Sequence, residues 1–254
     1  MPLCKKRSFA FIHIPKTGGS SIEKLLGITN PENFSSSDGK TYTFDGVTYS
    51  PQHLTPKLLS NLVPEFSGLV KFCFTRHPYQ KVVSEFFYLN CGFRKGVLSY
   101  RHDLLRDWIV NDLSKKDSDH KIDQSLYVDG CDYVFKYSDF GNAVGILNEI
   151  GIEVNGKMPH VLQSPTDANA VASSLPVDIY HLIEELYPND FEGLGYERRY
   201  TPEPHKDLGG SIFFSDGIDA HGAGNIADAI VFWNKGAVLG CHDCKRYLTW
   251  ISSR

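Results

Sequence analysis

The feature that most constrains the fold of this chain is a short apolar segment that runs into a glycine-containing turn, FIHIPKTGGSS at residues 11–21. Residues 8–14 are rich in Phe and Ile and stop at a proline, as is typical of a short buried strand. Over residues 19–26, apolar side chains recur at helical spacing, and Gly27 is suited to end the helix. A strand that leads through two glycines into a helix is the local pattern of a phosphate-binding loop.

This turn offers several groups that can hold an anion. Backbone N–H groups at a helix N-terminus carry partial positive charge and bind phosphate or sulfate oxygens, and Lys16 adds a mobile cation. The lysine precedes the glycines, so the order does not fit the G-x-x-x-x-G-K-[ST] loop of nucleoside triphosphatases. An ordinary helix cap after a tight turn, with Lys16 in solvent, is the alternative interpretation. The loop also contains two glycines that allow the backbone to approach a ligand closely, and three hydroxyls that can add donors or cap the helix. These residues are Thr17, Gly18, Gly19, Ser20 and Ser21.

Strands alternate with helices along most of the chain. A second apolar strand over residues 69–75 leads through a turn into a helix over 79–89, and a third strand over 132–137 leads into a helix over 140–150. Alternation of this kind predicts an α/β fold with a central, mainly parallel sheet flanked by helices. The sequence further predicts a hairpin around Asp45-Gly46 and helices near 56–62 and 176–187.

Composition excludes several classes of protein. The 254 residues are 41% hydrophobic and 22% charged, which is ordinary for a globular protein, and the net charge of -4 argues against a general nucleic-acid binder. No stretch approaches 18 uninterrupted apolar residues, so we expect no membrane span. The six cysteines are widely dispersed, as in proteins with reduced thiols, and we therefore expect a cytoplasmic location.

The second strand–helix unit adds a guanidinium and a hydroxyl. Arg76 follows the strand directly, and Ser84 lies on the polar flank of the next helix. Ligands of open parallel sheets bind outside the carboxyl ends of the strands, so we expect Arg76 to face the same crevice as the first loop. An arginine fork beside a hydroxyl suits a second, terminal phosphate, although a strand-end arginine paired with a surface carboxylate is the alternative for this position taken alone.

Together, FIHIPKTGGSSIEKLL and KFCFTRHPYQKVVSEFFYL resemble the sulfotransferases that use 3′-phosphoadenosine 5′-phosphosulfate (PAPS). The resemblance is closest to the carbohydrate group that contains the heparan sulfate 2-O- and 6-O-sulfotransferases and their bacterial relatives. It implies a P-loop-like three-layer sandwich in which the first loop holds the 5′-phosphosulfate and the second unit holds the 3′-phosphate. Carried over by position, the 5′ site comprises Lys16, Thr17, Gly18, Gly19, Ser20 and Ser21, and the 3′ site comprises Arg76 and Ser84.

A weaker resemblance continues downstream. CDYVFKYSDF is similar to the family's third strand, although Lys136-Tyr137-Ser138 replaces its Arg–Tyr–Glu-like pattern, and MPHVLQSP at residues 158–165 has Gln163 where the family has Asn. ELYPNDFEGLGY resembles the end of the family domain. We therefore expect a PAPS-binding domain over 1–196 and an extension over 197–254 packed on it, either as edge strands or as a separate subdomain.

Sulfuryl transfer to a hydroxyl benefits from a general base, for which histidine is the usual residue. In YSPQHLT, between the two nucleotide motifs, His53 corresponds to the histidine that the resemblance implies to be the base; a loop histidine that caps a helix at Thr55 is the alternative. We expect His13 to pack inside the first strand and His77 to fill a turn or contact the nucleotide. Lys16, placed beside the leaving 5′-phosphate, would stabilise the charge that develops as the S–O bond breaks.

The sequence leaves the acceptor and two other functions open. The leading interpretation is an enzyme that transfers a sulfuryl group from PAPS to a hydroxyl or amine of a small-molecule or saccharide acceptor and releases 3′,5′-adenosine bisphosphate. Arg94, Lys95 and Arg101 are candidates for binding an acidic acceptor. An ATP-dependent kinase of the P-loop class and a non-catalytic adenine-nucleotide-binding protein are the alternatives. We expect no metal site, because the C-x-x-C at residues 241–244 lacks a second pair and is more typical of two buried thiols.

Overall fold

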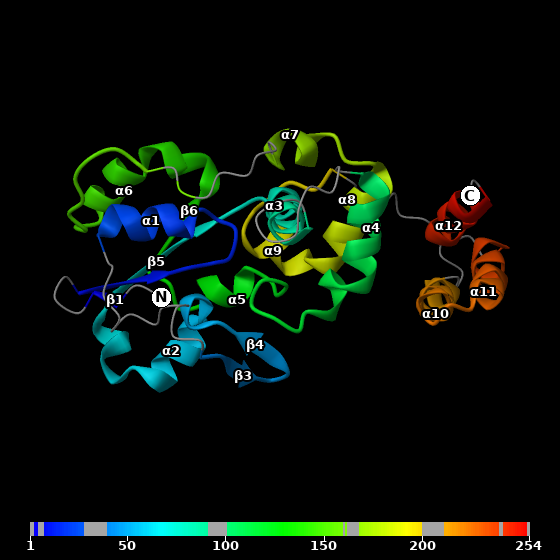
Figure 1. Cartoon of the computed structure of the whole chain (residues 1–254), viewed down its shortest axis with the longest axis horizontal. Coiled ribbons are helices and arrows are strands. Elements are labelled where there is room, and N and C mark those ends of the chain that lie inside the picture. Colours follow the sequence, from blue (N-terminus) through cyan, green and yellow to red (C-terminus); the bar gives the residue numbers. More distant parts are fainter. Residues whose placement is uncertain are drawn as a thin grey trace. The chain divides into compact units, whose positions relative to one another are not determined.

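A computed structural model describes residues 3–4, 8–27, 40–90, 101–159, 161, 168–199, 211–238 and 241–252 (Figure 1). Arg94, Lys95 and most of the segment 158–165 lie outside these residues. The chain divides into two compact units, Met1–Tyr200 and Thr201–Arg254.

A four-stranded sheet lies at the centre of the first unit. Its strands follow the order β1 (Leu3–Cys4), β2 (Phe9–Ile12), β5 (Val70–Thr75) and β6 (Tyr133–Lys136). β2, β5 and β6 are parallel, and β1 pairs antiparallel with β2. The predicted α/β class with a mainly parallel sheet flanked by helices is therefore confirmed. Because the three parallel strands end at the same edge, the turns that follow them lie close to one another.

Alternating side chains bury both faces of the sheet. Phe11 and Phe72 share a core cluster with residues of α1 (Gly19–Leu26) and α6 (Ala143–Glu149). Ile12 and Cys73, which point to the opposite face, share a cluster with residues of α2 (Pro56–Leu62) and α5 (Ser125–Val128). Figure 1 shows these two helix pairs on opposite faces, so the sheet is the middle layer of three.

A separate group of helices packs around α3 (Pro78–Asn90) and fixes its position. Val83 and Phe86 of this helix lie in a core cluster with Leu105 and Ile179. The helices that pack around α3 are α4 (His102–Asn111), α7 (Ala168–Ser173), α8 (Val177–Leu186) and α9 (Pro188–Gly193).

The predicted hairpin is present as β3 (Tyr42–Phe44) and β4 (Val47–Tyr49). Asp45 and Gly46 connect the strands with φ angles of 48° and 78°. Two consecutive residues with positive φ match the turn that suits the twist of a two-residue hairpin. The 3-10 turn η3 (Pro51–His53) follows directly and leads into α2.

The second unit consists of α10 (Ser211–Gly222), α11 (Ile226–Val238) and α12 (His242–Ser252). They pack around Trp233 and two buried free thiols, Cys241 and Cys244. Within the described residues of this unit there are helices and no strand, which does not support the edge-strand alternative. No helix in the described part of the chain combines the length and apolar character needed to cross a membrane.

Candidate active site

The first loop leaves backbone donors available at the start of α1. Gly18 is the residue before the helix and has a left-handed φ of 85°, and Lys16 is also left-handed at 66°. The side chains of Ser20 and Ser21 do not cap the helix, so that expectation was wrong. Among the described residues, no hydrogen bond uses the backbone N–H of Gly19 or Ser20. These groups remain available to an anion.

Both glycines of the loop are required by packing within the protein. A Cβ on Gly19 would lie 2.1 Å from Cδ2 and Nε2 of the His13 ring, and a Cβ on Gly18 would lie 2.6 Å from the ring of Phe140. The sequence predicts that these glycines allow a ligand to approach the backbone closely. The structure adds a second reason, because His13 and Phe140 occupy the space that larger residues would need.

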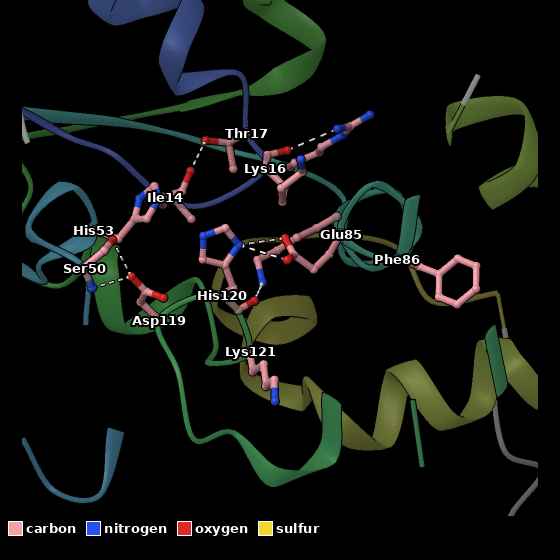
Figure 2. Close-up of polar contacts among 12 residues, drawn as sticks. Ile14, Lys16, Thr17, Ser50, His53, Glu85, Phe86, Asp119, His120 and Lys121 are labelled. Carbon is pink, nitrogen blue, oxygen red and sulfur yellow. Dashed lines mark hydrogen bonds and ion pairs between the residues drawn. The ribbon is translucent and has the colours of Figure 1, made fainter. Parts of the chain in front are cut away.

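Two of the three loop hydroxyls hold the loop itself. The buried Thr17 hydroxyl donates to the carbonyl oxygen of Ile14 at 2.9 Å (Figure 2). The Ser21 hydroxyl accepts a hydrogen bond from the backbone N–H of Val161 at 3.0 Å. The second bond connects the loop to the segment after Met158. Ser20 lies in the first turn of α1 and is half-buried. Its hydroxyl has no hydrogen bond among the described residues.

Arg76 and the first loop meet at the carboxyl edge of the sheet. One guanidinium nitrogen, Nη1, donates to the backbone carbonyl of Lys16 at 3.1 Å, and Nη2 donates to Oδ1 of Asn169 at 2.7 Å. The guanidinium carbon lies 4.4 Å from the centre of the Tyr137 ring, which follows β6. The turns after all three parallel strands thus converge, as the topology led us to expect.

The Lys16 ammonium lies over the ring of Tyr88 on α3, 3.9 Å from its centre. Burial lowers the pKa of Lys16 to about 8; Glu85 acts to raise the pKa, whereas Arg76 and Lys81 add to the lowering. At neutral pH the Lys16 amine is therefore still protonated, but it holds its proton less firmly than in water. A positive charge in a partly dry site favours an anionic ligand.

Ser84 is buried on the face of α3 that also carries Lys81, Glu85 and Tyr88, since residues three and four apart share a helix face. No hydrogen bond among the described residues joins the Ser84 hydroxyl to Arg76. Lys81 donates to the backbone carbonyl of His120 at 3.0 Å, which connects this helix face to a segment far along the chain.

His53 is buried and neutral. Its Nδ1 lies 2.8 Å from the carbonyl oxygen of His13 and donates to it, so the lone pair is on Nε2. Burial, together with the nearby rings of His13 and His120, pushes the pKa of His53 well below its ordinary value. His53 does not cap α2; the hydroxyl of Thr55 does, by accepting from the N–H of Leu58 at 3.4 Å.

His13 was expected to pack within the first strand, but it follows β2 and takes part in a polar network. Its Nδ1 lies 2.7 Å from Glu23 on α1, and Gln52 also donates to Glu23 at 3.0 Å. Burial would raise the pKa of Glu23, but the hydrogen bonds from His13 and Gln52 hold it below its usual value. The centre of the His13 ring lies 4.5 Å from that of the His53 ring, which it meets edge-on, so this network helps to hold His53 in place.

A second histidine in the site was missed from the sequence. Nδ1 of His120 lies 2.9 and 3.0 Å from the two carboxylate oxygens of Glu85, and Figure 2 shows His120 between Glu85 and His53. Asp119 accepts hydrogen bonds from the backbone N–H and the hydroxyl of Ser50 at 2.8 and 2.7 Å. Residues 117–123 are polar and non-periodic and match no motif, so no sequence signal marked them.

His77, the remaining histidine considered from the sequence, packs among aromatic rings. Its ring stacks on that of Tyr79, with 4.8 Å between the ring centres. The centre of the His77 ring lies 5.0 Å from that of Tyr196 and 5.8 Å from that of Phe191. These contacts agree with the turn-filling interpretation. The site therefore combines unused loop N–H groups, an ammonium and a guanidinium with a neutral histidine, a set that can bind an anionic group and take a proton from a hydroxyl.

A model of the sulfotransferase family matches residues 2–197. No curated protein and no solved structure matches the chain significantly. The matched range contains the sheet, the first loop, Arg76 and the histidines, and it ends before α10.

Proposed function

Because the chain belongs to the sulfotransferase family, whose members transfer sulfuryl groups, we propose that its donor is PAPS. The proposed acceptor is a hydroxyl or an amine of a small molecule or saccharide, and the second product is 3′,5′-adenosine bisphosphate. The motifs around Lys16 and Arg76 also lead us to propose the heparan sulfate 2-O/6-O-like carbohydrate group as its subgroup.

The observation that carries this proposal is the hydrogen bond between Arg76 and the carbonyl of Lys16. It unites two cationic motifs, 60 residues apart in sequence, at one edge of the sheet. A donor with a phosphosulfate at one end and a phosphate at the other needs two such anion sites side by side. The unused N–H groups before α1 and the Lys16 ammonium fit the 5′ end, and Arg76 with Ser84 fits the 3′ phosphate.

Each residue has a defined part in the transfer. The donor, when bound, supplies an activated sulfuryl group, and positioning and charge stabilisation dominate reactions of this loose, in-line type. Lys16 stabilises the negative charge that develops on the leaving 5′-phosphate. Nε2 of His53 takes the proton of the acceptor hydroxyl, while the carbonyl of His13 holds the ring in the required tautomer.

Two measurements test the proposal. Calorimetric titration with 3′,5′-adenosine bisphosphate should show binding that ATP with Mg²⁺ does not match, and labelled PAPS should pass its label to an acceptor. His53→Asn keeps a donor at the position of Nδ1 and removes Nε2. We expect this variant to bind the bisphosphate like the wild type and to lose about 10²–10⁴-fold in transfer rate.

His102→Ala is the matched control, because this histidine is exposed on α4 and should leave both measurements unchanged. Selective binding of ATP would contradict the proposal and favour a P-loop kinase, which the family match also weighs against. Tight bisphosphate binding without transfer to any acceptor would favour a non-catalytic nucleotide-binding protein. A screen of metabolite extracts for products that gain the mass of a sulfuryl group would identify the acceptor.

A further inference from the structure

Beside the expected base lies a second histidine that the mechanism above does not use. His120 follows the 3-10 turn η5 (Leu113–Lys115), and its ring lies edge-on to the ring of His53 at 5.0 Å. Because Nδ1 of His120 donates to Glu85, the lone pair of the neutral ring is on Nε2. The two rings therefore have the same tautomer, each with Nδ1 bonded to an acceptor of the protein and Nε2 left for chemistry.

The two histidines differ in their access to solvent. His53 is 6% exposed, whereas the side chain of His120 is 25% exposed. A base that takes a proton in each turnover has to lose it before the next one. The buried position of His53 gives its proton little direct access to water, but His120 lies next to it and reaches the surface.

The charges around the pair favour a proton on His120 over one on His53. Burial opposes charge on His120, but Glu85 and Asp119 raise its pKa above the ordinary value despite Lys81. Burial and the neighbouring imidazoles lower the pKa of His53 well below it. A proton transferred from His53 to His120 therefore moves to the group with the higher proton affinity.

The distance between the rings suits such a transfer. One ring nitrogen of His53, one of His120 and a carboxylate oxygen of Asp119 lie within 4.8 Å of one another. At this separation a single water can bridge two nitrogens. Titratable and charged groups face the pair from three parts of the fold. They are His13 after β2, Asp119 beside His120, and Lys81, Glu85 and Tyr88 on α3. Lys16 acts on the pair through its interaction with Glu85.

We propose, on the basis of the proposed sulfuryl transfer, that His120 is a proton-relay residue that takes the acceptor's proton from His53 and releases it to solvent. In the transfer, the acceptor O–H bond breaks and its proton goes to Nε2 of His53. The acceptor oxygen forms a bond to sulfur, and the electron pair of the broken S–O bond stays on the 5′-phosphate. The proton then passes to Nε2 of His120, where the Glu85 carboxylate stabilises the imidazolium, and leaves to water.

The test separates a relay from a base and from a structural role. His120→Asn keeps a donor toward Glu85 and removes the relay nitrogen. We expect its single-turnover rate to stay near that of the wild type, because His53 still takes the first proton, while kcat falls by about tenfold or more. In His120→Ala, added imidazoles should restore kcat, and the rate should depend on the pKa of the imidazole used.

A titration that needs no turnover accompanies the kinetics. In the wild type, NMR of the Cε1–H signals should show His120 titrating above His53, and Glu85→Gln should lower the pKa of His120. Unchanged kcat in His120→Asn, no rescue by imidazoles, or full activity of His53→Asn would overturn the relay. Activity lost on chelation and restored by Zn²⁺ would also overturn it, since a metal ion would then occupy the space between the rings.

Failure of the relay and failure of the proposed function give different results. If the wild type transfers no label from PAPS to any acceptor, the proposed function fails. If the wild type transfers the label and His120→Asn behaves like it in both kinetic regimes, the relay fails and the proposed function stands.

Discussion

Replacing Gly19 by alanine tests the closest contact in the first loop. The new Cβ would lie 2.1 Å from the His13 ring, and real Cβ atoms essentially never come closer than 3.0 Å to a neighbour. The ring has little freedom to move away. Nδ1 of His13 is hydrogen-bonded to Glu23, and the backbone carbonyl of His13 accepts a hydrogen bond from His53. The centre of the His13 ring lies 5.6 Å from that of Phe11, on which it stacks, and 4.5 Å from that of His53, which it meets edge-on.

The expected destabilisation follows from this geometry. Overpacking a well-packed site costs about 1–3 kcal/mol, and a neighbour that is hydrogen-bonded and buried puts Gly19→Ala near the upper end. Alanine's better helix propensity offsets at most about 1 kcal/mol, and less in the first turn. We therefore expect the variant to lose about 2–3 kcal/mol of unfolding free energy.

Urea unfolding followed by hydrogen exchange of the β2 and β5 peptides measures this loss in the first unit. Gly141→Ala is the control, because a Cβ there meets nothing within 4 Å and its φ is not positive. The double variant with His13→Ala should be more stable than the sum of the two single changes by about 2 kcal/mol, because the ring that clashes is gone. A Gly19→Ala protein as stable as the control, or a double variant without this coupling, would refute the reasoning.

Two further predictions concern the anion site. Because burial lowers the pKa of Lys16 to about 8, the ammonium loses its charge as the pH rises through that value. Bisphosphate affinity measured by calorimetry should therefore fall above about pH 8, which gives its pH profile a basic limb. Lys16→Arg keeps the positive charge and should remove this basic limb. Arg76→Lys loses the fork that bonds both Lys16 and Asn169, and we expect bisphosphate affinity to fall about 10–100-fold, while Arg101→Lys at an exposed position should bind like the wild type.

The strand–loop–helix units were predictable because local signals agree with the tertiary structure there. The helix expected over 19–26 is α1 with the same bounds, and Gly27 ends it with a left-handed φ of 65°. The first strand is shorter than expected, ending at Ile12, because the N–H of Ile14 bonds back to the carbonyl of Ile12 and turns the chain. Parallel topology then predicted that Arg76 and the first loop would meet, which their hydrogen bond confirms.

The histidine side of the site was only partly predictable. Resemblance led to His53, but its burial, its tautomer and the role of the His13 carbonyl depend on contacts across 40 residues of sequence. Glu85 directly follows Ser84, but its burial could not be predicted from the sequence. The helix has an amphipathic pattern, and a single buried carboxylate does not change its periodicity. The second unit showed only a change of composition, since Gly- and Asp-rich segments disguise the helices that its apolar residues form.

Glu85 connects the two halves of the chemistry. Burial alone would raise its pKa, yet His120, Lys16 and Lys81 hold it below the usual value, so the carboxylate is charged and interacts with the His120 ring and two ammonium groups. A proton that arrives on His120 offsets part of this charge, and the ammonium of Lys16 is then less favoured. The proposed relay residue, His120, and the residue proposed to stabilise the leaving phosphate, Lys16, are therefore electrostatically linked through Glu85. For this reason Glu85→Gln should alter both the His120 titration and the basic limb set by Lys16, whereas His120→Asn, which keeps the carboxylate, should leave the basic limb in place.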